Sequence, residues 1–207
     1  MVNLRAPRCG IVVCLALATV GCASTVAPDR RATSTVPPPG PPRATAVARP
    51  VVPDGWLGGL RELDIDAPPD IVMDVLADPE ANRRTMPFVR SLDVIGQGPQ
   101  GEALMTIVQG TALVHGRYTA HLLRERADRI HIWLDGALPH DIEAADGFAE
   151  VRPREGGGSH LTWFLAFDVG ATTRFLFGGK IQRAAMSTPE RVRALAEERA
   201  RERNASP

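Results

Sequence analysis

The sequence predicts an α+β domain in which a curved antiparallel sheet of about seven strands packs against a long C-terminal helix. Three observations lead to this prediction. Segments with alternating apolar and polar residues follow one another between short turn sequences. Two short helical segments come directly after the first strand, and residues 172–203 have helical periodicity. Strands joined by short turns pair antiparallel and leave one apolar face to cover, and only the C-terminal helix is long enough to cover it.

Proline sets the boundaries of the two short helices. Pro68 and Pro69 precede the first of them, which we expect at 70–77, because proline is tolerated at a helix start. The second, at about 80–85, ends before Pro87, since the residue before proline is disfavoured in helical geometry. The seven strands are expected at about 58–66, 89–96, 101–109, 114–125, 129–135, 146–152 and 159–168.

The C-terminal segment is predicted to be one helix, kinked at Pro189, rather than two independent helices. Its apolar positions keep the helical period on both sides of this proline. The sequence 187–190 (Ser-Thr-Pro-Glu) would also suit the start of a new helix, so this alternative stays open. The apolar stripe consists of Phe177, Ile181, Ala184, Ala185, Val192, Leu195 and Ala196.

The N-terminal residues have the pattern of a lipoprotein leader and a tether. Residues 1–21 combine two arginines with a 13-residue apolar run, which is typical of a secretory signal peptide. The end of this run, Ala18–Cys22, resembles a bacterial lipobox, which implies cleavage before Cys22 and lipidation of that residue. An ordinary secreted protein is the alternative. Residues 22–54 are rich in proline and favour a disordered tether.

This leader predicts a protein held in the cell envelope by a lipid anchor. The residue after Cys22 is Ala23 rather than aspartate, which favours the periplasmic face of the outer membrane. The folded domain is expected at 55–203, followed by a disordered tail at 204–207.

Composition argues against several classes of partner. The chain has 24 Lys and Arg against 24 Asp and Glu, so we expect no nucleic-acid partner. Its five histidines show no metal-site spacing, and all three cysteines lie in the first 22 residues. We therefore expect no metal, no cofactor and no cysteine nucleophile in the domain.

Alternation also predicts which side chains face the interior. In 114–125 the more apolar set contains Tyr118 and Leu122, and Arg117 falls on the opposite face with two histidines, His115 and His121, that we interpret as solvated. A three-residue loop at 126–128 would pair the next strand so that Leu122 lies opposite Ile132 and Ala120 opposite Leu134. The two faces of 101–109 are similarly apolar, so its inner face is left open.

Several short stretches carry a family resemblance: Ile65–Val72 between the first strand and the first helix, Gly116–Thr119, and Leu161–Trp163 at the end of a hairpin. They resemble the corresponding segments of the START/Bet v 1-like superfamily, also called SRPBCC, which includes polyketide cyclases and lipid-transport proteins. Met73 stands where the family often has tryptophan, and Gly116 where it has aspartate. The resemblance implies a helix-grip fold with a cavity between the sheet and the C-terminal helix.

The resemblance implies a binding module for a hydrophobic or amphipathic small molecule, such as a lipid, quinone or polyketide-like compound, and an apolar interior with few ionisable groups suits such a ligand. The alternatives are a cyclase or dehydratase that uses the same cavity, and an envelope scaffold whose interior is filled by its own side chains. His140 and Asp141 are the candidate acid–base pair for an enzyme. The candidate ligand-binding residues are Tyr118, Leu122, Ile132, Leu134, Trp163, Leu165, Phe167, Phe177 and Ile181, with Arg117 for a polar head group.

Overall fold

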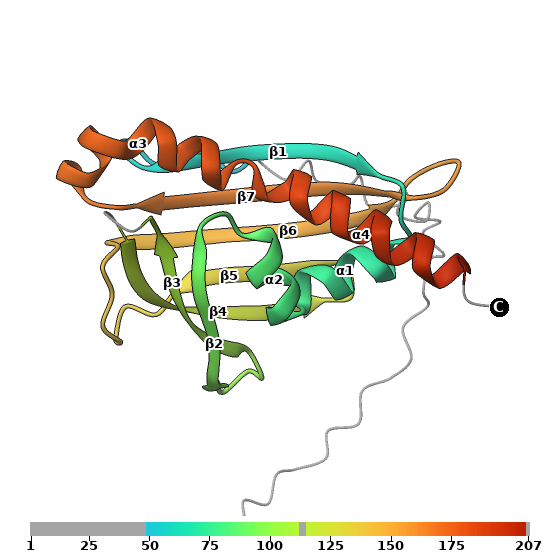
Figure 1. Ribbon diagram of the computed structural model, residues 1–207, viewed down its shortest axis with the longest axis horizontal. Coiled ribbons are helices and arrows are strands. Elements are labelled where there is room, and N and C mark those ends of the chain that lie inside the picture. The colour runs from blue at the N-terminus through green and yellow to red at the C-terminus, as the bar shows by residue number, and fades with distance from the viewer. Residues whose placement is uncertain (1–48, 112–114, 206–207) are drawn as a thin grey trace, which may run out of the picture. The chain divides into compact units, whose positions relative to one another are not determined.

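The computed structural model describes residues 49–111 and 115–205, which belong to one compact unit, residues 47–207 (Figure 1). The predicted signal peptide, the lipidation site Cys22 and the tether as far as residue 48 lie outside the described residues. No helix in the described part of the chain is long and apolar enough to cross a membrane. The elements are β1 (Leu57–Ile65), α1 (Pro69–Ala77), α2 (Pro79–Thr85), β2 (Val89–Gln97), β3 (Ala103–Gly110), β4 (His115–Arg126), β5 (Arg129–Leu134), β6 (Ala144–Pro153), β7 (Ser159–Asp168), α3 (Ala171–Ala185) and α4 (Thr188–Ala205).

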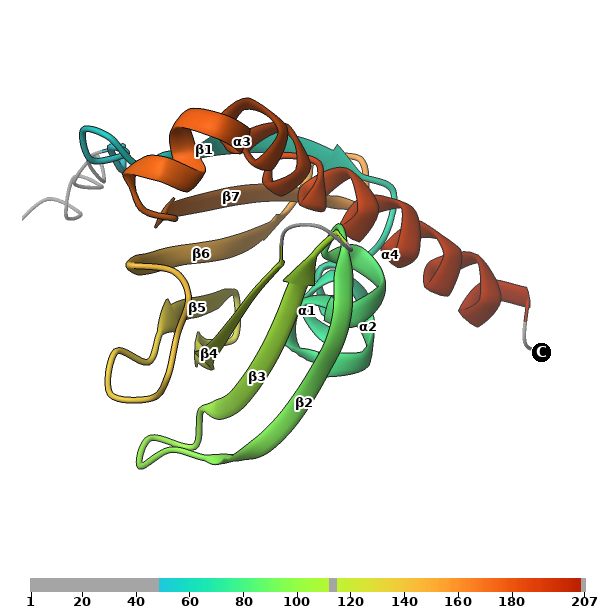
Figure 2. The ribbon, with the colours of Figure 1, turned by 60° about the vertical axis from the view of Figure 1, so that its left-hand side comes forward.

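The seven strands form one antiparallel sheet in the order β1-β7-β6-β5-β4-β3-β2. The chain runs as a meander from β2 to β7, and β1 then pairs with β7, so the edges of the sheet are β1 and β2. The sheet curves, and α1 and α2 lie within the curve beside α4 (Figure 2). The predicted α+β helix-grip architecture is therefore confirmed.

The predicted register of β4 and β5 is correct, but the connection differs. Leu122 pairs with Ile132 and Ala120 with Leu134. The expected loop of three residues is a two-residue turn, because Arg126 already pairs with Arg129. A register irregularity between residues 124 and 126 restores the alternation that a two-residue turn would otherwise shift. The apolar pattern thus determined which faces meet, and a bulge accommodated the short turn.

The inner face of β3, which the sequence left open, carries Met105 and Ile107. Both are fully buried and pack with Ala120 of β4 in one cluster. Their register partners on β4 are Ala120 and Tyr118, which belong to the predicted inner set. Burial against neighbouring strands therefore selects one of two faces that are similar in composition.

The C-terminal segment is helical from Ala171 to Ala205, as predicted, and is interrupted at Met186 and Ser187. The break comes directly before Pro189, where the sequence predicted a kink and left open a new start. The amide of Met186 still donates to the carbonyl of Gln182. Pro189, the second residue of α4, lacks an amide proton that the first turn does not need, so α4 starts there without losing a hydrogen bond.

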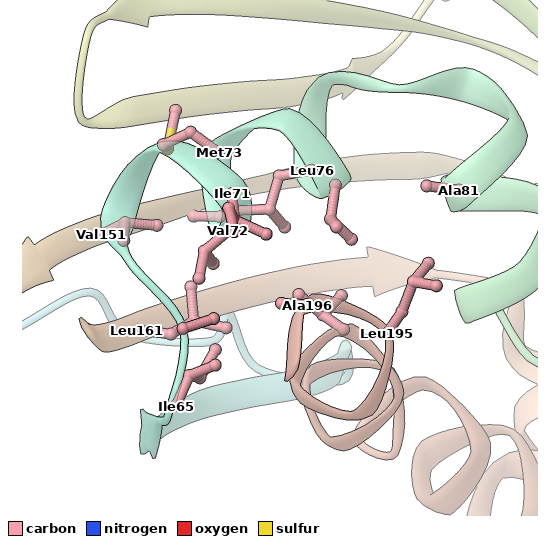
Figure 3. Packing of buried hydrophobic residues seen from close by; sticks show 14 of the residues in the cluster. Ile65, Ile71, Val72, Met73, Leu76, Ala81, Val151, Leu161, Leu195 and Ala196 are labelled. Carbon is pink, nitrogen blue, oxygen red and sulfur yellow. The ribbon is translucent and has the colours of Figure 1, made fainter. Parts of the chain in front are cut away.

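The larger buried cluster fills the part of the concave face next to α1 and α4. In α1, Ile71, Val72, Met73, Val75 and Leu76 are all buried. They meet inner side chains of the sheet and of α4, including those drawn in Figure 3. The labelled members are Ile65, Ile71, Val72, Met73, Leu76, Ala81, Val151, Leu161, Leu195 and Ala196.

Helix α3 is attached to the edge strand β1. The side-chain amide of Gln182 donates to the carbonyl of Gly58, and its oxygen accepts from the amide of Gly58, each at 2.6 Å. These bonds satisfy backbone groups that an edge strand otherwise leaves to solvent. Gly58 has a φ of 127°, and a Cβ there would lie 1.9 Å from the carbonyl oxygen of Leu165, so only glycine fits.

Candidate functional site

The candidate site is the part of the concave face that lies between two buried clusters. The larger cluster surrounds α1 and α4, and the smaller one contains Met105, Ile107 and Ala120. Between them the inner side chains of β5 and β7 keep part of their surface exposed. Leu161 is fully buried, whereas Leu165, on the same strand and the same face, is partly exposed and belongs to neither cluster. Leu134 of β5 is likewise partly exposed and outside both clusters.

The structure brings most of the predicted sheet residues onto this one face. Tyr118, Leu122 and Ile132 pack at the margin of the smaller cluster, and Leu122 also touches the larger one. Trp163 packs against the larger cluster and Phe167 is buried. These residues therefore form the margin of the open area, with Leu134 and Leu165 inside it.

The remaining three predicted residues are not gathered in the same way. Arg117 is exposed and on the opposite face from Tyr118, because successive residues of a strand point to opposite sides. Its backbone amide donates to Oδ2 of Asp141 at 2.7 Å. Phe177 and Ile181 are partly buried on α3, which is attached to the β1 edge.

Tyr118 is the main polar group of the inner set, and it is held in a hydrogen-bonded chain. Its hydroxyl donates to Oε1 of Gln109 at 2.7 Å, and Nε2 of Gln109 donates to the carbonyl of Pro87 at 2.7 Å. Burial raises the pKa of Tyr118 well above its ordinary value, so the hydroxyl stays protonated at physiological pH. Gln109 is the residue that sequence reasoning missed, because its inner position depended on the open choice of face in β3.

Two further polar groups share the inner face of β1 and β7. Arg61 of β1 lies opposite Trp163 in the register and is exposed. The indole nitrogen of Trp163 is buried and has no hydrogen-bond partner within the described residues. A buried N–H without an acceptor costs free energy, so a ligand oxygen placed beside it would be stabilised.

Two surface grooves lie away from the open area around Leu134 and Leu165. One, of about 420 Å³, runs between α1 and α4 and is lined by Ile71, Asp74, Arg199, Glu202 and Arg203. The other, of about 430 Å³, lies beside β1 and the junction of α3 and α4, where Arg61, Gln182 and Met186 contribute to its wall. Neither groove contains a predicted site residue, and both are largely open to solvent.

The convex face carries a polar cluster around Trp133. The ring of His121 stacks on Trp133 with centroids 4.7 Å apart, and its Nε2 lies 3.1 Å from Oδ2 of Asp135. Its Nδ1 lies 3.4 Å from Oε1 of Glu102. His121 is therefore partly buried rather than solvated as expected. Backbone donation from Ala137, followed by His121, holds the pKa of Asp135 below its ordinary value.

This polar cluster stabilises the sheet surface and contains no metal-binding arrangement. Within residues 49–111 and 115–205 there is no group of three or more His, Cys, Asp or Glu side chains placed to hold a metal ion. The candidate acid–base pair lies at the surface, because His140 and Asp141 are both exposed and Asp141 accepts a hydrogen bond from the backbone amide of Arg117.

Solved structures with this fold include enzymes and START proteins. The Zhui aromatase/cyclase from Streptomyces sp. R1128 superposes with a TM-score of 0.59 at 15% identity, covering 70% of this chain and 95% of that one. A START superfamily protein from Mycobacterium smegmatis gives a TM-score of 0.55 at 14% identity, covering 70% and 98%. The di-domain ARO/CYC StfQ of the steffimycin biosynthetic pathway gives a TM-score of 0.55 at 15% identity. The superposition covers 70% of this chain and 52% of StfQ, so this chain spans about half of that protein.

These identities are low, so the superpositions establish the fold alone. No curated protein matches the sequence significantly. A family model described as polyketide cyclase / dehydrase and lipid transport matches residues 61–197, which is more than half of the chain and includes strands β2 to β7 and part of β1. The chain therefore belongs to the polyketide cyclase/dehydrase and lipid transport family, and it has the fold of the START superfamily structures.

Proposed function

We propose that this protein is a membrane-anchored binding module for a hydrophobic or amphipathic small molecule, such as a lipid, quinone or polyketide-like compound. The ligand would lie on the inner face of the sheet, beside the C-terminal helical segment. One observation carries the proposal: Leu161 is fully buried, while Leu165 and Leu134 on the same inner face are only partly covered. The chain's own side chains fill one part of the concave face and leave another part available.

The chemistry of this surface suits an uncharged apolar guest. Burying about 10 methylene groups at ~0.8 kcal/mol each contributes about 8 kcal/mol before the costs of association. The protonated Tyr118 hydroxyl, the side chain of Gln109 and the indole N–H of Trp163 are the polar groups on its margin. These neutral groups suit one or two oxygen atoms of an amphipathic ligand, and the charged group on the same inner face, Arg61, is exposed.

Co-purification tests the proposal. The protein from its native host is extracted with organic solvent, and the extract is analysed by mass spectrometry. We expect a lipophilic compound in stoichiometric amount, and we expect the same compound to raise the melting temperature when added back. An extract without such a compound, from a protein that no added lipid, quinone or polyketide stabilises, would overturn the proposal in favour of a scaffold.

A pair of variants locates the ligand. Leu165→Trp places a large ring in the open area and should abolish co-purification, and Leu134→Trp serves if the first variant does not fold. Leu123→Trp is the matched control, because Leu123 shares the convex face of β4 with His121. Equal loss of the ligand in the control would place the ligand elsewhere.

The membrane attachment is part of the same proposal and is supported by the sequence around Cys22. We expect radiolabelled palmitate to be incorporated into the wild-type protein in the envelope, at the periplasmic face of the outer membrane. Cys22→Ser should abolish the label and release the protein from membranes. Labelling that persists in this variant would exclude the anchor.

A cyclase or dehydratase is the second candidate. Tyr118 favours it, because a buried, neutral hydroxyl on the inner face is able to donate a proton or a hydrogen bond to a carbonyl oxygen. Replacing Tyr118 with Phe should then abolish turnover of a poly-β-ketone substrate while leaving its binding largely intact. A binding module without chemistry would show no turnover in either form.

A further inference from the structure

Helix α3 exposes large apolar side chains although it is attached to the domain. Phe175 keeps 89% of its surface exposed and Leu176 keeps 61%. Both lie in the first two turns of α3, directly after the end of β7. Exposing two adjacent large hydrophobic residues is unfavourable in water, so this surface is a candidate for contact with an apolar or amphipathic partner.

The same helix is locally cationic. Residues 169–189 contain no aspartate or glutamate, and their charged residues are Arg174, Lys180 and Arg183. Arg174 pairs with Asp168 at 3.0 Å. Lys180 and Arg183 are exposed, and neither has an ion pair within the described residues. The chain as a whole is neutral, so this excess of positive charge is a property of one surface rather than of the protein.

The exposed side of α3 carries both apolar and cationic side chains. Gly178 is buried, and a Cβ on it would lie 3.7 Å from Cδ2 of Leu57, so this position marks the face packed against β1. At 100° per residue, Leu176, Lys180 and Arg183 lie about 140–160° from Gly178, on the opposite side of the helix. Phe175 lies about 60° from Gly178, at the side of the packed face, and is nevertheless 89% exposed. The exposed surface of α3 therefore combines a leucine and two cations on one side with an aromatic ring next to them.

We propose that this exposed surface of α3, defined by Phe175, Leu176, Lys180 and Arg183, docks on the surface of an anionic phospholipid bilayer. Phenylalanine and leucine enter the boundary between head groups and acyl chains, and the two cations contact lipid phosphates. The combination of charge and apolar exposure selects a membrane over a soluble acidic protein, which would not require the exposed ring. The proposal needs neither a lipid at Cys22 nor a bound ligand.

Docking would place the candidate site beside the membrane. α3 follows the end of β7 that carries Leu165 and Phe167, so the bilayer would lie close to the partly covered inner face. A lipophilic guest would then have a short path between the acyl chains and the sheet. Failure of the binding-module proposal would leave the docking surface untouched, because the two use different faces and different residues.

Vesicle binding tests the docking surface. Residues 47–207 contain every strand, every described helix and both buried clusters, so this unit has its own core and lacks Cys22. Its binding is measured by co-flotation with two kinds of vesicle. One contains phosphatidylcholine with about 30% phosphatidylglycerol, which gives the vesicle a negative surface potential, and the other contains phosphatidylcholine alone. We expect binding to the anionic vesicles only, weakened by salt.

Single substitutions separate the two contributions. Phe175→Ser and Leu176→Ser should each weaken binding about tenfold, because each removes most of a buried apolar side chain from the bound state. Lys180→Gln and Arg183→Gln should each weaken it about fivefold. The matched controls are Ile95→Ser, which is 55% exposed on β2, and Arg90→Gln, an exposed cation on the same strand, and both should bind like the wild type.

Each other outcome overturns the proposal in a defined way. Equal binding to neutral vesicles would remove the role of charge, and wild-type binding by Phe175→Ser and Leu176→Ser would remove the inserted helix. A domain that binds neither kind of vesicle would refute the docking surface altogether. Phe175→Trp gives a second readout, since its fluorescence should shift to shorter wavelength on adding anionic vesicles and stay unchanged if α3 remains in water.

Discussion

Truncating two leucines on one face of β7 distinguishes the packed part of the interior from the open part. Leu161 is completely buried among α1, α4 and the sheet, so Leu161→Ala should lower the free energy of unfolding by about 3–5 kcal/mol. Leu165 is partly exposed and lies outside both clusters, with Gly147 beside it on β6. Because the partly exposed Leu165 has roughly half as many packing contacts to lose, Leu165→Ala should lower the free energy of unfolding by about 1–2 kcal/mol.

Urea unfolding of residues 47–207, followed by circular dichroism, measures both losses in one assay. The two variants have the same change in chemistry on the same strand, so backbone and propensity effects largely cancel. Ligand binding should change in the opposite order, with Leu165→Ala weakening it and Leu161→Ala leaving it nearly unchanged in the folded protein. Equal losses of stability would mean that the inner face is packed throughout, and the argument for an available surface would be refuted.

Three further predictions concern the helices and one loop. Gln182→Ala removes both side-chain hydrogen bonds to β1, so amide exchange in α3 should accelerate while Lys180→Ala leaves it unchanged. Arg199 donates a hydrogen bond to Asp78 and thereby holds the pKa of Asp78 below its ordinary value. The stabilisation by this pair is therefore complete above about pH 4 and is lost as the pH falls through the lower pKa of the folded state. Asp78→Asn should flatten the stability profile between pH 5 and pH 2.5 (roughly the range of carboxylate titration), and an unchanged slope would contradict this assignment. Phe88 is 60% exposed and has a φ of 59°, a backbone conformation that glycine adopts more readily. Phe88→Gly should therefore leave the free energy of unfolding in urea unchanged or raise it by up to about 1 kcal/mol. A large loss would indicate packing of Phe88 that the structure does not contain.

Most of the sheet could be predicted because strand periodicity is a local signal. The inner set of β4 and β5 and the pairing of Leu122 with Ile132 followed from alternation alone. The two-residue turn did not, since a bulge preserves the same faces with one residue fewer in the loop. For β3, both faces are apolar enough to be buried, and only the packing of Met105 and Ile107 with Ala120 decides between them.

The candidate site was predictable as a set of inward-facing residues and less so as a shape. Sequence alternation placed Tyr118, Leu134 and Leu165 on one face, and the structure agrees. Which of them are covered depends on α1, α4 and α3, whose contacts are distant along the chain. The stacking of His121 on Trp133 likewise joins neighbouring strands and leaves no local signature.

The order of elements, the apolar faces of β4, β5 and β7 and the lack of negative charge around α3 were determined by the sequence alone, because each depends on residues within a few positions of one another. The tertiary structure decided where the C-terminal segment lies. The break at Met186 and Ser187 lets α4 pack on α1, while Gln182 fixes α3 to the β1 edge. Part of the concave face is therefore filled and part is left available. The periodicity of α3 and α4 does not reveal this division, because it depends on which part of the sheet each helix packs against.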